Sequence, residues 1–191
     1  VLQFFFPYLC VEIISSAMLL LVITVTIQRP EEMMDSIVGT MSNQAFLADT
    51  KQAFRSRRPM SVLLIHFTNH SALRNNLGLF TFQFLLRRLA DKTVRISKIM
   101  NLHPDIYYLD HGSFAVITDD KHDEALLDLG RMIHAYMQEP VRLKHTETQV
   151  NTMECLVKCP DDIYDYDVFI SVSRSFQNKL INNHRVIVLS D

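Results

Sequence analysis

Tryptophan is absent from this 191-residue chain, and glycine is scarce, with only 4 residues. A glycine-rich loop that holds phosphates through its backbone N–H groups has little to be built from, and none is present. The formal net charge is only −2, so no excess of positive charge attracts a nucleic acid. Hydrophobic residues make up 48% and charged residues 21%, which is the composition of a chain that folds around a core.

Cysteine is also rare, since the chain has only Cys10, Cys155 and Cys159. The last two are separated by three residues in a run with the pattern of a strand. Along a strand this spacing spans about 13 Å at about 3.3 Å per residue, which is too far for a disulfide or a shared metal ion. We therefore expect both to be reduced, buried thiols, as in a protein exposed to the cytosol.

Charge is nearly missing from the N-terminal segment, where Glu12 is the only charged residue before Arg29. This segment includes an apolar run from Ala17 to Val25 in which Thr24 is the one polar residue, and about 20 mainly apolar residues are enough to cross a bilayer as a helix. We expect a transmembrane helix over residues 1–28; a buried core helix is the alternative. A signal peptide is disfavoured, because there is no initiating Met, no basic first region and no small-residue cleavage site. The missing Met also indicates an excerpt from a longer protein.

Arginine residues lie on the C-terminal side of this segment, at positions 29, 55, 57 and 58. Because basic residues flank membrane spans on the cytoplasmic side, we expect residues 29–191 to lie in the cytoplasm. Residues 29–58 are polar and compatible with a helix, and we expect a connecting helix that leads into a domain over residues 59–191.

The rest of the chain mixes strand and helix patterns without a repeat. The apolar run Ser61–Phe67 is typical of a buried strand. Apolar residues at helical spacing predict amphipathic helices over residues 72–92, 121–138 and 165–181. The pattern predicts an α/β (α+β) fold with a central mixed β-sheet flanked by helices and preceded by the transmembrane helix.

A hairpin is predicted over Tyr107–Ile117, "YYLDHGSFAVI". Two apolar strand patterns flank Asp110-His111-Gly112-Ser113, whose residue types favour a tight turn. With this hairpin the chain resembles a known family. The domain from about Asp35 to Leu189 resembles the GGDEF domain of diguanylate cyclases.

Three further stretches carry the resemblance. "DSIVGTMSNQAF" is similar to the opening motif D-x-L-T-G-L-x-N-R-x-x-F, and "HFTNHSALRNNLG" falls on D-x-D-x-F-K-x-x-N-D-x-x-G. "YLDHGSFAVI" falls on the signature R-L-G-G-D-E-F-A-V-I, and "NKLINNHRV" is similar to A-K-x-x-G-R-N-R-V. The retained landmarks are Asp35, Gly39, Phe46, Gly78, Leu109, Phe114, Ala115, Val116, Ile117, Lys179, Arg185 and Val186.

The resemblance implies a reaction that joins two GTP molecules into cyclic di-GMP, with Mg²⁺ held by carboxylates. The family's metal-binding positions fall on His66, Gly112 and Ser113, which do not offer the hard oxygen ligands that Mg²⁺ prefers. Its paired glycines fall on Asp110 and His111. We therefore expect a degenerate signature with no catalytic residue, no metal and no cofactor.

The family's base-reading Asn and Asp fall on Arg74 and Gln83, and a neighbouring glycine falls on Phe82. The ring of Phe82 would occupy space that a base needs. The inhibitory motif R-x-x-D should fall on Asn101–Pro104, where it is absent. Lys179 remains as a weak candidate for a phosphate contact.

Other chemistry-bearing residues have structural alternatives. His66 and His70 are four residues apart but straddle a strand end, and an exposed turn histidine is the simpler interpretation of His111. The three phenylalanines Phe80, Phe82 and Phe84 are expected in the core, with a docking patch as the alternative. The acidic cluster Asp161, Asp162, Asp165 and Asp167 precedes a predicted helix, and we expect it to cap that helix.

The resemblance implies a non-catalytic regulatory module, not an enzyme, in a membrane-bound cyclic di-GMP signalling protein. Such a module would control or dimerise an EAL phosphodiesterase domain that follows in the same chain. The alternative is an allosteric receptor for GTP or another nucleotide without cyclase activity, and an enzyme of altered chemistry ranks last. The expected partners are the membrane and a second copy that pairs through helices. The expected location is the bacterial inner membrane.

Overall fold

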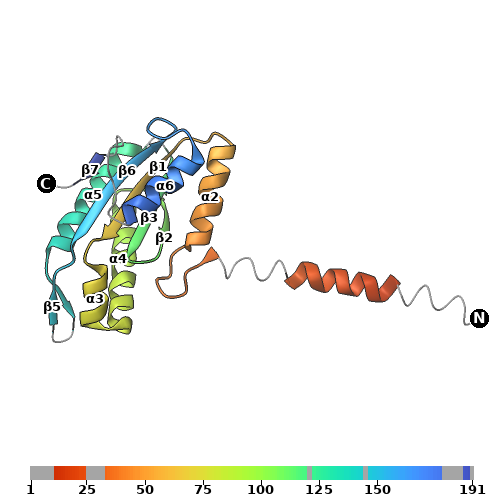
Figure 1. The fold of residues 1–191 in the computed structure, drawn as a ribbon, viewed down its shortest axis with the longest axis horizontal. Helices are drawn as coiled ribbons and strands as arrows, with labels where there is room; N and C mark the ends of the chain where they lie inside the picture. Colours follow the sequence, from red (N-terminus) through yellow and green to blue (C-terminus); the bar gives the residue numbers. More distant parts are fainter. Residues whose placement is uncertain (1–10, 25–32, 120–121, 144–145, 178–186, 190–191) are drawn as a thin grey trace, which may run out of the picture.

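The computed structural model describes residues 11–24, 33–119, 122–143, 146–177 and 187–189. The domain is a five-stranded sheet of order β2-β3-β1-β6-β7 with helices on both faces, and a separate hairpin pairs β4 with β5 (Figure 1). The elements are α2 (Asn43–Arg55), β1 (Met60–Phe67), α3 (His70–Leu77), α4 (Leu79–Ile99), β2 (Asp105–Tyr108), β3 (Ser113–Thr118), α5 (Asp123–Gln138), β4 (Val141–Leu143), β5 (Thr146–Thr148), β6 (Thr152–Cys159), α6 (Tyr166–Gln177) and β7 (Ile187–Leu189).

Strand β1 lies at the centre of the sheet, and all eight of its residues are buried. The continuous apolar run predicted this, because a strand covered on both faces does not alternate polar and apolar residues. It pairs antiparallel with β3 on one side and with β6 on the other. The prediction of a mixed sheet is wrong for the described strands, since each of their pairings is antiparallel. For β1 and β3 the reason is that the β2–β3 hairpin reverses the chain before β3 meets β1.

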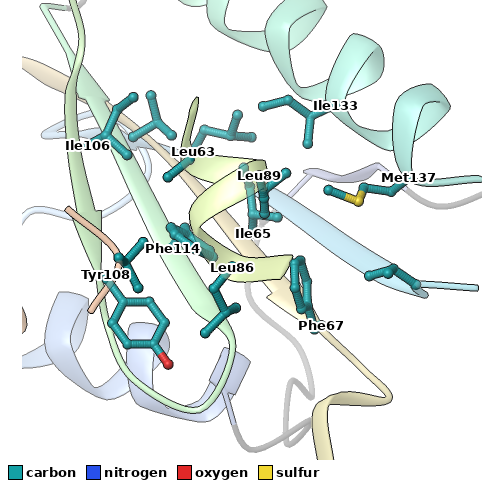
Figure 2. Close-up of a cluster of buried hydrophobic side chains, with 14 of the residues drawn as sticks. Leu63, Ile65, Phe67, Leu86, Leu89, Ile106, Tyr108, Phe114, Ile133 and Met137 are labelled. Carbon is teal, nitrogen blue, oxygen red and sulfur yellow. The ribbon is translucent and has the colours of Figure 1, made fainter. Parts of the chain in front are cut away.

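Two hydrophobic cores cover the two faces of the sheet. Helices α4 and α5 pack on Leu63, Ile65 and Phe67 of β1, as Figure 2 shows for part of this cluster. Helices α2 and α6 pack on the other face, against Val62 and Leu64. Alternate β1 side chains therefore point to opposite cores, as the pleat of a strand requires.

The helix predicted over residues 72–92 is interrupted. Gly78 has a φ of 75°, and it separates α3 from α4. A residue in this left-handed region cannot continue an α-helix, and glycine adopts it at little cost. Helical periodicity continues across the break, so the pattern alone did not reveal it.

The predicted transmembrane helix over residues 1–28 is not seen. The described helix in this segment covers residues 11–24 and would be about 21 Å long at about 1.5 Å per residue, which is shorter than the hydrocarbon core of a bilayer. Among the described residues no helix is long and apolar enough to cross a membrane. Residues 1–10 and 25–28 of the predicted span lie outside the described residues.

The cysteine prediction is confirmed for the two described residues. Cys155 and Cys159 are free and buried in the core between the sheet and helices α2 and α6. Burial raises the pKa of each thiol to about 12, so both remain protonated at neutral pH.

One carboxylate is buried in the sheet. Glu154 of β6 has a fully buried side chain, and its Oε2 lies 2.9 Å from Nδ1 of His134 on α5. Its Oε1 has no hydrogen-bond partner within the described part of the chain. Burial raises the pKa of this carboxyl above its usual value, and the interactions with Thr152 and His134 only partly oppose that rise.

We predict that Glu154 makes stability depend on pH. A carboxyl whose pKa is raised in the folded state stabilises the fold below its unfolded pKa of about 4.5, and this stabilisation is lost as pH rises through the folded pKa. Glu154→Gln should remove that loss. The free energy of unfolding of the variant, relative to that of the native chain, should therefore increase as pH increases. Urea unfolding at a series of pH values measures this, with the exposed Glu139→Gln as control. Identical pH profiles for the native chain and Glu154→Gln would contradict the prediction.

Candidate functional site

The tip of the β2–β3 hairpin has an unusual backbone. Asp110, His111 and Gly112 have φ values of 70°, 48° and 73°. The turn is closed by hydrogen bonds from Leu109 N–H to the Ser113 carbonyl and from Ser113 N–H to the Asp110 carbonyl. Left-handed backbone suits glycine, so Asp110 and His111 adopt it at a cost in free energy.

His66 and Ser113 lie directly opposite each other where β1 and β3 pair. His66 Nδ1 is 2.8 Å from Ser113 Oγ, and both residues are buried. At these two positions, where the sequence resemblance expects metal ligands, the structure therefore has an imidazole and a hydroxyl in contact. Within the described residues no group of three His, Cys, Asp or Glu side chains is arranged to hold a metal ion.

Three histidines form a row beside the tip. The ring centroids of His66 and His70 are 5.4 Å apart, and those of His70 and His111 are 6.1 Å apart. His70 is held at the start of α3, with Nδ1 3.2 Å from the Phe67 carbonyl and Nε2 3.1 Å from Ser71 Oγ. The sequence spacing indicated no relation between His70 and His111, because they lie on different elements.

A cavity of about 630 Å³ opens between the hairpin tip and helices α3 and α4. Its polar lining comes from Asp35, His70, Ser71, Arg74, Asn75, Gln83, Tyr108, Asp110 and His111. Arg74 and Gln83 fall where the resembled family reads the base. They line the same cavity as Asp110 and His111 of the hairpin tip. This volume lies in the usual range for small-molecule sites.

Phe82 lines this cavity without filling it. Its side chain is 5% exposed and belongs to the core with Leu85 and Leu86. The ring forms part of the cavity wall, and the expectation that it takes space needed by a base stays a prediction. Its neighbours Phe80 and Phe84 are 84% and 59% exposed, so the predicted core position is wrong for these two residues, which lie on the outer side of α4.

Two lining residues have a defined electrostatic or structural role. Burial raises the pKa of the Tyr108 phenol above its usual value, and its hydroxyl oxygen accepts a long hydrogen bond of 3.5 Å from the Gly112 N–H at the hairpin tip. Asp35 Oδ1 accepts hydrogen bonds from the N–H groups of Ile37 and Val38. The sequence indicated Asp35 only as a landmark and gave no signal for Asn75 or Tyr108, because their nearness to the tip depends on the packing of distant elements.

The remaining candidates have other positions. Asp165 caps α6 by accepting from the N–H groups of Asp167 and Val168, and Asp162 accepts from the Lys158 N–H, so the capping interpretation is confirmed for Asp165. Lys179 lies outside the described residues, so its phosphate contact stays a prediction.

Comparison with solved structures identifies this fold as that of GGDEF domains. The GGDEF domain of FimX from Pseudomonas aeruginosa is similar to this chain with a TM-score of 0.62 and 16% identity, over 78% of this chain and 93% of the solved domain. The GGDEF domain of DgcB from Caulobacter crescentus, in complex with c-di-GMP, has a TM-score of 0.62 and 9% identity, over 77% and 89% of the two chains. The active GGEEF domain of a diguanylate cyclase from Vibrio cholerae has a TM-score of 0.54 and 18% identity, over 71% and 85%.

No family model matches the sequence, and neither does any curated protein. The fold comparison corrects one expectation. The prediction that the chain is not an enzyme is contradicted, because the domains that share its fold include an active diguanylate cyclase domain.

We predict that the hairpin tip is strained. Asp110→Gly and His111→Gly should each raise the free energy of unfolding by about 0.5–1 kcal/mol, since glycine relieves the left-handed conformation but gains entropy when unfolded. Gly112→Ala is the matched control, and it should change stability in the opposite direction. An added Cβ would lie 3.0 Å from His70 Cβ and 3.3 Å from Phe67 Cβ. This substitution should therefore lower the free energy of unfolding by about 1–2 kcal/mol. Urea unfolding measures all three, and destabilisation by both glycine substitutions would refute the strain.

Proposed function

We propose that this chain is a signal-transducing module of cyclic di-GMP signalling, which binds a nucleotide in the cavity at the hairpin tip. The observation that carries the proposal is the cavity itself. It brings together residues from α3, α4 and the hairpin that are far apart in the sequence. The likeness to the DgcB domain in complex with c-di-GMP supports the choice of pathway.

The lining offers groups suited to a nucleotide. Gln83 can both donate and accept hydrogen bonds to a base edge, and the Arg74 guanidinium can bind a phosphate or a ring nitrogen and oxygen pair. The apolar floor contains Phe82 and Leu86, against which a planar base can pack. Asp110 and Asp35 line the same cavity, and their charge opposes phosphates on that side. A bound nucleotide would therefore direct its phosphates toward Arg74.

We predict opposite effects from the two signs of charge in this cavity. Arg74→Gln should weaken nucleotide binding by about tenfold or more, because a charge-assisted hydrogen bond is lost. Asp110→Asn should tighten the binding of a triphosphate by about fivefold, since a charge about 4 Å away in water is worth about 1 kcal/mol. Calorimetric titration of the whole chain with GTP, ATP and cyclic di-GMP measures both variants.

Arg95→Gln is the matched control, because Arg95 is exposed on α4 and does not line the cavity. The proposal fails if no nucleotide binds saturably, or if Arg74→Gln and Arg95→Gln have equal effects. The same preparations are assayed for cyclic di-GMP formation from GTP with Mg²⁺ or Mn²⁺. Product formation lost in Arg74→Gln would support the cavity as the nucleotide site.

The proposed context is a larger signalling protein at the bacterial inner membrane, with this domain in the cytoplasm. Residues 11–24 support it, since this helix is exposed and mainly apolar, with Glu12 as its one charged residue, and an exposed apolar surface of this kind is typical of a helix covered by lipid or by another helix. We propose that the module works as a homodimer and controls an EAL phosphodiesterase domain in the same chain. Recovery of the full-length protein in the soluble fraction after cell lysis would refute the membrane location.

A further inference from the structure

A second cavity, of about 400 Å³, lies at the end of β1 opposite the hairpin tip. Helix α2 ends there, and the loop after β6 begins there, because Met60 pairs with Cys159. The walls are mainly apolar and include Phe54, Met60, Pro160 and Tyr164. Arg57 and Arg58, which are neighbours in the sequence, also line it.

The end of α2 fixes how these arginines are presented. Arg58 N–H donates to the Ala53 carbonyl at 2.9 Å, and Arg57 N–H donates to the Phe54 carbonyl at 3.2 Å. These two bonds form a Schellman motif, which requires left-handed backbone at the first residue after the helix cap. That residue is Arg57, with a φ of 52°. Glycine is the usual residue there, so the arginine side chain is present despite strain.

Of the two aromatic rings that line this cavity, one is fixed by its neighbours and the other is exposed. Phe54 is half-buried, and its ring lies against Phe169 and Tyr166 with centroid distances of 5.4 Å and 5.8 Å. Tyr164 is 75% exposed, so its ring is available to a ligand. A planar ring can pack between a fixed and an exposed aromatic side chain.

The two guanidinium groups retain free hydrogen-bonding capacity. Both side chains are exposed, and within the described ranges no ion pair joins Arg57 or Arg58 to a carboxylate. Asp105 interacts with Arg58 only through a longer-range electrostatic effect. Cations near a helix C-terminus also interact favourably with its dipole. Arg58 already provides this interaction, so the dipole does not explain why an arginine occupies the strained position 57.

We propose that this cavity binds a small planar aromatic ring that carries an oxyanion, with the ring between Phe54 and Tyr164 and the oxyanion on Arg57 and Arg58. Guanidinium groups bind phosphate and carboxylate oxygens through paired hydrogen bonds. This site shares no residue with the cavity at the hairpin tip, so it is independent of the proposed nucleotide site.

Phenyl phosphate and benzoate are the aromatic probes, titrated into the whole chain by calorimetry, with inorganic phosphate as the probe without a ring. Arg57→Gly should weaken the binding of phenyl phosphate by about tenfold or more. The same variant should melt about 1–4 °C higher, because the strain is relieved. Weaker binding by a more stable protein cannot result from a failure to fold.

Tyr164→Ala should weaken phenyl phosphate and leave inorganic phosphate unchanged. Arg55→Gln is the matched control, because Arg55 is exposed beside the motif but does not line the cavity. The proposal is overturned if phenyl phosphate does not bind saturably, if it binds no more tightly than inorganic phosphate, or if Arg57→Gly and Arg55→Gln bind it equally.

Discussion

Burial of β1 on both faces is the constraint on which the rest of the structure depends. Every residue of this strand is buried, and its alternate side chains belong to the two cores. Pairing with β3 on one side and β6 on the other then leaves no freedom of register, because a shift by one residue would exchange the two faces. This register sets His66 opposite Ser113 at one end and Met60 opposite Cys159 at the other. Both cavities lie at these ends of the same strand.

Left-handed backbone at residues other than glycine occurs at each of these ends. At the hairpin tip it affects Asp110 and His111, and at the end of α2 it affects Arg57. In each case the surrounding hydrogen bonds require the conformation: the turn between β2 and β3 in one, and the Schellman motif in the other. Strain that is maintained by its surroundings is often associated with function. At these two places the strained residues also line a cavity.

The fold is shared with GGDEF domains at identities of only 9–18% in the comparisons above. Such a likeness rests on the pattern of burial, since strand and helix cores accept many apolar sequences of similar volume. Residues at the hairpin tip contribute little to those cores, so they can change while the fold persists. For the same reason, the fold alone does not assign a reaction. The changed signature residues at the hairpin tip likewise did not justify the prediction that the chain is not an enzyme.

Local patterns in the sequence were enough to predict β1, the β2–β3 hairpin, helix α5 and the buried thiols of Cys155 and Cys159. Each of these follows from periodicity, turn chemistry or spacing, which depend on neighbouring residues. Only the tertiary structure separated buried Phe82 from exposed Phe80 and Phe84, because which face of α4 meets the core depends on where the sheet lies. It also determined the break at Gly78, the contact of His70 with His111 and the left-handed backbone of Arg57. The sign of a backbone angle and the meeting of distant elements are set by the packing of the whole chain, so local sequence does not contain them.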